Sequence, residues 1–102
     1  MKAIYKYVVT DVPSVISGSN TDVIITVPKN SKILCCKIQH GKDICIWAEV
    51  DIEEKDVEKY RLGFVGTGWL MIEENLADYE YLDSILINDG MFVYHIYIKK
   101  GV

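Results

Sequence analysis

Short runs of alternating apolar and polar residues, separated by turn-forming residues, follow one another along the chain. The segments Ala3–Val9 and Val23–Val27 are the first two runs, and the second ends at Pro28. Alternation with a period of two indicates half-buried β-strands, because successive side chains of a strand point to opposite faces. The intervening residues 10–21 contain proline, glycine, serine and asparagine, so we expect a loop there.

The next two runs, Ile33–Gln39 and Ile44–Val50, predict a hairpin. A two-residue turn at Gly41-Lys42 suits their connection, since glycine accepts the positive φ that such turns require. In this register Lys37 pairs with Ile46.

A second hairpin is predicted near the end of the sequence, where Tyr81–Ile87 and Met91–Ile98 flank Asn88-Asp89-Gly90. Its register places His95 opposite residue 83 or 84. Both runs are largely apolar on both faces, so we expect central strands, or a face that a second copy of the chain covers. The pattern therefore predicts a homo-oligomer.

The middle of the chain begins with the densely charged residues 51–58, which fit a solvated loop or a single helical turn. Tyr60–Val65 then predicts a return strand, which we expect to pair with Ile44–Val50. The Gly66-Thr67-Gly68 segment predicts a sharp bend that brings Trp69 against another element.

Residues 69–80 fit either a short helix or a loop. Taken together, these segments predict a mainly β fold. We expect a single small antiparallel sheet system of about seven strands, either a sandwich or an open barrel, with at most one short helix. The composition agrees, because 14 Ile and 11 Val stand against 3 Ala and 6 Leu, and β-branched residues favour strands. The 102 residues predict one domain, residues 1–102.

The sequence has no apolar run near the ~20 residues that a membrane span needs, and its first residues lack the pattern of a signal peptide. We therefore expect an intracellular protein that does not enter a membrane.

The charge of the sequence is unevenly distributed: residues 1–50 carry six Lys and four acidic residues, whereas residues 51–102 carry four Lys, one Arg and eleven acidic residues. An acidic chain with one arginine argues against binding to polymeric nucleic acid, but it leaves room for a small anionic ligand.

The sequence contains no phosphate loop, nucleophile elbow or metal-binding helix, and it predicts no cofactor and no metal site. The thiols of Cys35, Cys36 and Cys45 are expected to be reduced and mostly buried, with the first two on opposite faces of a strand. A pairing of His95 with Asp83 or with a hydroxyl is the one acid–base arrangement that the sequence offers. Since no clear nucleophile accompanies it, we expect a protein that is not an enzyme.

Aromatic residues that carry polar atoms suit interfaces and stacking sites, and two tryptophans stand among polar residues or glycines. We expect a ligand site to contain Trp47, Trp69 and His95, with Arg61 or Lys37 supplying positive charge. Stacking on an indole combined with a charge-assisted contact can hold a purine phosphate. Lys37 and Trp47 would equally form a surface cation–π pair.

Five short motifs carry a resemblance that spans nearly the whole sequence and keeps their order. The chain resembles a family of small uncharacterised proteins of phages and prophages. It departs from the family in a longer loop at residues 10–21 and in the tail 99–102. The resemblance implies a viral accessory protein of unknown function in the host cytoplasm, with no site residues to transfer. The motifs are Ile4-Tyr5-Lys6-Tyr7, Pro28 through Lys32-Ile33-Leu34, Cys45-Ile46-Trp47-Ala48-Glu49-Val50-Asp51, Gly66-Thr67-Gly68-Trp69 and Tyr94-His95-Ile96-Tyr97.

Three classes of function follow. The first is a non-catalytic oligomer that binds and sequesters a small nucleotide-type host signal, which would make it a counter-defence protein; this step rests on analogy. The second is a protein–protein interaction module that binds a host or virion protein. The third is a small enzyme that uses His95.

Overall fold

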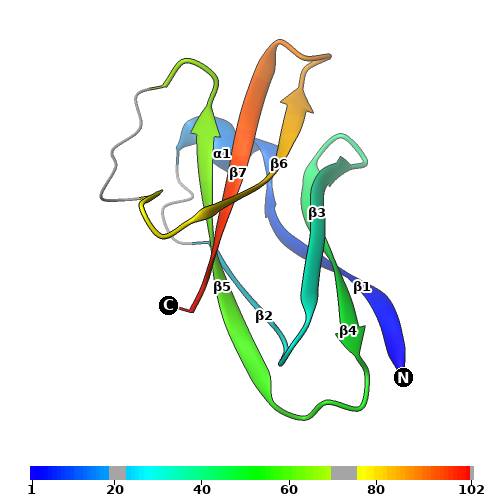
Figure 1. The fold of residues 1–102 in the computed structure, drawn as a ribbon. Helices are drawn as coiled ribbons and strands as arrows, with labels where there is room; N and C mark the ends of the chain where they lie inside the picture. The colour runs from blue at the N-terminus through cyan, green and yellow to red at the C-terminus, as the bar shows by residue number, and fades with distance from the viewer. Residues whose placement is uncertain (19–22, 70–75, 102) are drawn as a thin grey trace.

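The computed structural model describes residues 1–18, 23–69 and 76–101. Within these ranges the chain forms seven strands in two antiparallel sheets and one short helix, which confirms the predicted mainly β fold. The two sheets face each other as a sandwich (Figure 1). The elements are β1 (Lys2–Asp11), α1 (Val12–Ser17), β2 (Val23–Pro28), β3 (Lys32–Gln39), β4 (Asp43–Asp51), β5 (Val57–Gly66), β6 (Glu80–Ile87) and β7 (Phe92–Lys100).

The chain changes sheet several times as it proceeds. The first sheet has the order β1-β4-β3 and the second has the order β2-β5-β7-β6. Strand β5 therefore pairs with β2 and β7, and the expected pairing of this return strand with β4 is wrong. The connection between β4 and β5 crosses from one sheet to the other (Figure 1), so that the apolar faces of these strands belong to opposite walls of the core.

A helix stands where the sequence predicted a loop. Strand β1 extends to Asp11, whose carboxylate accepts a hydrogen bond from the backbone N–H of Ser14 at 2.8 Å and so caps α1. Pro13 lies in the first turn, where its missing N–H is tolerated, and Gly18 ends the helix at a φ of 75°. This spacing of aspartate, proline and glycine is a helix signal that the interpretation of residues 10–21 as a loop overlooked.

Three residues, His40, Gly41 and Lys42, connect β3 to β4, one more than the predicted two-residue turn. His40 and Gly41 have positive φ values of 57° and 67°, and histidine enters this region more readily than most residues. Lys37 consequently lies opposite Cys45, so the predicted pairing with Ile46 is wrong.

The register of the second hairpin is confirmed, because His95 lies opposite Ser84. Strand β7 is central in its sheet, as expected, whereas β6 forms an edge. The outer face of the hairpin is partly open, since 61% of Leu86 is exposed.

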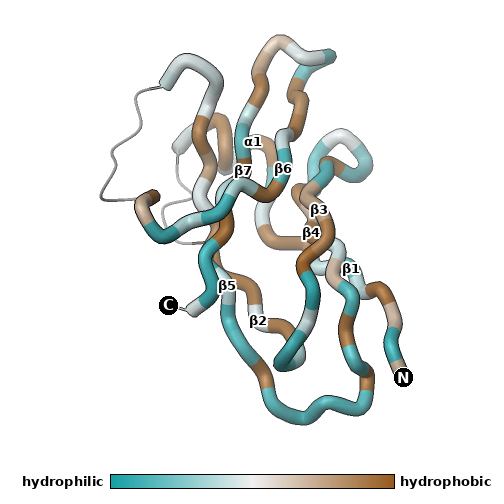
Figure 2. Tube along the Cα trace, viewed as in Figure 1, coloured by the Kyte–Doolittle hydropathy of each residue, from teal (hydrophilic) through white to brown (hydrophobic). Residues whose placement is uncertain are grey.

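The hydrophobic core fills the space between the sheets with side chains that alternate with exposed ones along the strands. Ile44, Ile46 and Ile96 are completely buried. Figure 2 shows hydrophobic residues along the strands and a mostly hydrophilic connection after β4. The sequence left open whether residues 69–80 form a short helix or a loop. Half of this segment, residues 70–75, lies outside the described residues. The buried cluster comprises Val15, Val23, Ile25, Val27, Cys36, Ile44, Ile46, Leu62, Ile85, Ile87, Tyr94, Ile96 and Ile98.

Asp83 joins the edge of one sheet to the edge of the other. Its Oδ2 accepts a hydrogen bond from the backbone N–H of Cys36 at 3.0 Å, and its Oδ1 lies 3.2 Å from Nζ of Lys37. The backbone N–H of Ser84 also donates to this carboxylate. Burial raises the pKa of Asp83, but these hydrogen bonds and the Lys37 ammonium together hold it below its ordinary value. The carboxylate thus satisfies an edge N–H of β3 that would otherwise face β6 unpaired.

We predict that Asp83→Asn lowers the free energy of unfolding at pH 7 by about 1–3 kcal/mol, because the amide cannot replace all the contacts of the carboxylate. A lowered pKa in the folded protein means that this contribution is complete above the ordinary aspartate pKa of about 3.9 and is lost as the pH falls through the folded-state pKa. Urea unfolding across this range should therefore show the two proteins converging only below about pH 4. Asp89→Asn, at an exposed turn position, is the control, and an equal effect there would contradict the assignment.

Candidate functional site

The five residues predicted for a ligand site lie on three separate surfaces. Lys37 and Trp47 are on the outer face of the first sheet, whereas Arg61 and His95 are on the outer face of the second. Trp69 follows β5 at one end of the core. A single chain therefore brings only Lys37 and Trp47 close together, because Arg61 lies opposite Lys99 whereas His95 lies opposite Val65, four positions further along β5.

The surface around Trp47 combines an indole with several lysines, and we call it the Trp47 face, formed by Lys6, Lys32, Lys37, Trp47 and Glu49. Lys6 lies directly opposite Trp47 on β1. Lys32 lies opposite Glu49 on β3, and Lys37 lies near the other end of the same strand. Direct and diagonal neighbours in a sheet are about 5–8 Å apart, so all three ammonium groups can reach a ligand that rests on the indole.

The lysines of this face are held by weak, exposed contacts. Nζ of Lys6 donates to Oε1 of Gln39 across β4, and Lys37 reaches the carboxylate of Asp83 at the sheet edge. More than half of the Lys37 side chain is exposed. Exposed contacts of this kind contribute little to stability, so a bound anion can replace them at small cost.

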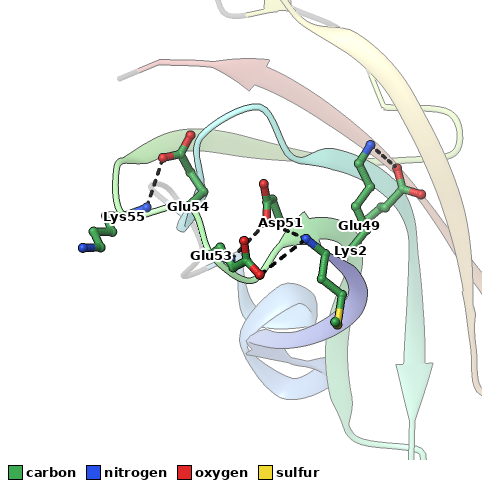
Figure 3. A network of polar contacts seen from close by, with 7 residues as sticks. Lys2, Glu49, Asp51, Glu53, Glu54 and Lys55 are labelled. Atoms are coloured by element: carbon green, nitrogen blue, oxygen red, sulfur yellow. Dashed lines mark hydrogen bonds and ion pairs between the residues drawn. The ribbon is translucent and has the colours of Figure 1, made fainter.

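Glu49 is the acidic member of the Trp47 face. Its Oε2 lies 3.7 Å from Nζ of Lys2, and 41% of its side chain is exposed (Figure 3). On the neighbouring strand Ile4 and Val8 are 63% and 58% exposed, which adds apolar surface on either side of Lys6. The face therefore offers stacking, positive charge and one carboxylate on a flat support.

The cysteines are arranged as the sequence predicted for neighbours in a strand. Cys36 points into the core, where burial and then the charge of Asp83 raise its pKa to about 12. Cys35 lies on the Trp47 side, opposite the indole, and is partly buried. Burial also raises the pKa of Cys45. Because the thiolate is the reactive form, Cys36 and Cys45 are poor nucleophiles.

His95 is held by two hydroxyl groups on the outer face of the second sheet. Its Nδ1 lies 2.8 Å from the hydroxyl of Tyr81, and its Nε2 lies 2.9 Å from Oγ1 of Thr67. Oγ1 of Thr67 also donates to the carbonyl of Val93 at 3.2 Å. Because Thr67 donates its hydroxyl proton to Val93, it accepts from Nε2–H of His95, and Nδ1 accepts from the Tyr81 hydroxyl. This tautomer satisfies every group in this series of hydrogen bonds. The predicted partner Asp83 faces the other sheet instead, because the turn pairs Ser84 with His95 and therefore places Asp83 opposite the buried Ile96. A bulge between Tyr81 and Asp83 then returns Tyr81 to the outer face, beside His95.

Trp69 packs against Tyr94 of β7, as the glycine bend predicted. Its ring meets Tyr94 edge-on, with centroids 5.6 Å apart and an interplanar angle of 87°. A Cβ on Gly66 would lie 2.6 Å from the indole, so glycine is needed for Trp69 to fold back. Trp69 remains 54% exposed. It lies beside an open hollow of about 320 Å³, lined by Gly66, Thr67, Trp69, Met91, Phe92, Val93 and Tyr94.

The tip and outer side of the β6–β7 hairpin expose large apolar side chains near this hollow. Leu86 is 61% exposed, Met91 is 75% exposed and Phe92 is 41% exposed. Leu86 is on the outer face, whereas Phe92 lies opposite the buried Ile87, so these side chains expose apolar surface around the hairpin tip rather than on one flat face.

Sequence reasoning missed Lys6 and Lys32 on the Trp47 face, and Thr67 and Tyr81 at His95. The alternation in β1 already placed Lys6 on the face opposite Tyr5 and Tyr7, but nothing local showed that β1 pairs with β4. Thr67 comes from a different hairpin than His95, so only the pairing of β5 with β7 brings them together.

Within the described ranges, no three His, Cys, Asp or Glu side chains converge as metal ligands would. None of the helical segments in those ranges is long and apolar enough to span a membrane.

The fold and these surfaces define a small antiparallel β-sandwich with a basic, aromatic outer face on one sheet. A family model described as a domain of unknown function, DUF7352, matches residues 1–101, so the chain belongs to this family. No curated protein and no solved structure matches the chain significantly.

We predict that Gly66→Ala displaces the Trp69 indole from Tyr94 and lowers the free energy of unfolding by about 1–2 kcal/mol. In a Trp47→Phe background, where Trp69 is the remaining tryptophan, the emission should shift to longer wavelength. Gly68→Ala is the matched control, since its φ of 86° strains an alanine but its Cβ meets nothing within 4 Å. An unchanged emission spectrum for Gly66→Ala would show that the indole does not need the glycine.

Proposed function

We propose that the protein is a non-catalytic binding protein that holds a small nucleotide-type anion on the Trp47 face. The observation that carries this proposal is the placement of three lysines around one indole on three adjacent strands. The two sheet pairings fix the backbone positions of these residues, so ligand binding orders side chains but no loop.

Stacking and charge supply the binding energy. A base that stacks on an aromatic side chain gains about 1–3 kcal/mol, and ammonium groups within reach of a phosphate add charge-assisted contacts. Because the face is flat and open to water, we expect a mononucleotide to bind with a Kd of about 0.1 mM. A ligand with two bases and two phosphates, or an assembly that joins two faces, would bind more tightly.

The remaining chemistry of the chain supports binding rather than catalysis. The hydroxyl partners of His95 occupy both ring nitrogens, and burial raises the pKa of two of the thiols. Following the resemblance to phage proteins, the ligand is a nucleotide-type host signal, and its sequestration in the host cytoplasm would be a counter-defence function.

Self-association belongs to the same proposal and rests on the β6–β7 hairpin. Its exposed residues Leu86, Met91 and Phe92 lie on the second sheet, so an oligomer formed through them leaves the Trp47 faces open. The same apolar surface favours a second candidate function, a module that binds a host or virion protein.

We predict that nucleotides quench the Trp47 emission in a Trp69→Phe background, where Trp47 is the remaining tryptophan. Calorimetry should show a loss of affinity of about 5- to 150-fold for Trp47→Ala and a smaller loss for Trp47→Phe, which keeps a stacking ring. Lys6→Met combined with Lys32→Met should weaken binding and reduce its dependence on salt. Lys59→Met, on β5 of the other sheet, is the control. A titration in which neither mononucleotides nor cyclic dinucleotides produce a signal would refute the proposed function.

We predict that light scattering at high micromolar concentration gives at least twice the chain mass of 11.7 kDa. Leu86→Asp combined with Met91→Asp should return the protein to a monomer, because a charge at a buried apolar contact is costly. The control is Ile4→Asp, an equally exposed substitution on the first sheet. A wild-type monomer would remove self-association and leave the hairpin to the second candidate function.

A further inference from the structure

We propose that Glu49 makes the Trp47 face selective for guanine, so that the ligand is a guanine nucleotide. This inference rests on the proposed function, because it names the class of ligand that the same site takes. It follows from the position of the carboxylate beside the indole.

Glu49 and Trp47 are two residues apart on β4, so their side chains leave the same face of the sheet as neighbours. That spacing is about 7 Å along a strand, which is comparable to the distance from the centre of a stacked base to an acceptor that is hydrogen-bonded to its edge. The Glu49 carboxylate therefore lies where the edge of a base on Trp47 would be.

A carboxylate on a surface that binds anions is unfavourable unless the ligand gives it hydrogen bonds. Glu49 repels phosphate, and its contact with Lys2 is an exposed ion pair at 3.7 Å, which compensates little. Each of its oxygens can accept further hydrogen bonds. The Glu49 carboxylate favours binding if the base offers two parallel N–H donors to its two oxygens.

Guanine is the common base that meets this requirement on one edge. Its N1–H and N2–H groups point the same way, so a carboxylate can accept both in a bidentate arrangement. Hypoxanthine keeps N1–H but lacks the 2-amino group, adenine has an acceptor at N1, and uracil has a single N–H. The lysines of the Trp47 face, from β1 and β3, then serve the phosphate.

The test compares guanosine, inosine, adenosine and uridine 5′-monophosphates by calorimetry on the full chain. We expect the wild-type protein to bind the guanosine nucleotide about 5- to 10-fold more tightly than the inosine nucleotide, which differs from it by one amino group. Glu49→Gln should weaken binding of the guanosine nucleotide and strengthen binding of the adenosine and uridine nucleotides, since it removes a negative charge. Glu80→Gln, at an exposed position on β6, should leave all four affinities unchanged.

The outcomes separate this inference from the proposed function. Equal affinities for the guanosine and inosine nucleotides, or a uniform gain for all four in Glu49→Gln, would overturn the guanine assignment while the Trp47 site stands. Absence of binding by all four nucleotides and by cyclic dinucleotides in the wild-type protein would overturn both. Circular dichroism of each variant checks that the substitution leaves the sheet intact.

Discussion

The burial of one apolar face from each sheet is the constraint on which the other features of this protein depend. A chain of 102 residues forms only a few strands. Every second side chain of these strands points into one core, which lies between β4 on one side and β5 and β7 on the other. Because side chains in a strand alternate, every residue placed in this core commits its neighbours to an outer face. Ile46 and Ala48 are buried, and this is why Trp47 points outward.

The sandwich leaves strand edges, and the chain satisfies one of them with a side chain. Asp83 bridges the edges of β6 and β3 and accepts the backbone N–H of Cys36. The carboxylate also holds Lys37 at the border of the Trp47 face. A contact that stabilises the fold thus helps to arrange the surface that we propose for ligand binding.

The two outer faces have different characters. The Trp47 face is flat, basic and aromatic, whereas the second sheet carries His95 within a chain of hydroxyl hydrogen bonds and an apolar hairpin tip. This separation allows one face to take a small anion while the other contacts protein. It also explains why the five residues expected at one site do not meet within a chain: the core lies between them.

Local sequence patterns determined most of the elements. The alternation predicted the strands, and the glycines around Thr67 predicted that Trp69 packs back on the chain. The Asn88-Asp89-Gly90 turn placed His95 opposite residue 83 or 84, and the structure has Ser84 there. These are effects of neighbours in sequence, where turn geometry and side-chain period decide the outcome. The tertiary structure alone decided that β5 pairs with β2 and β7 and that β1 pairs with β4. Those pairings brought Lys6 to Trp47 and Thr67 to His95, because contacts between distant strands depend on how whole apolar faces match across the core, which no local pattern encodes.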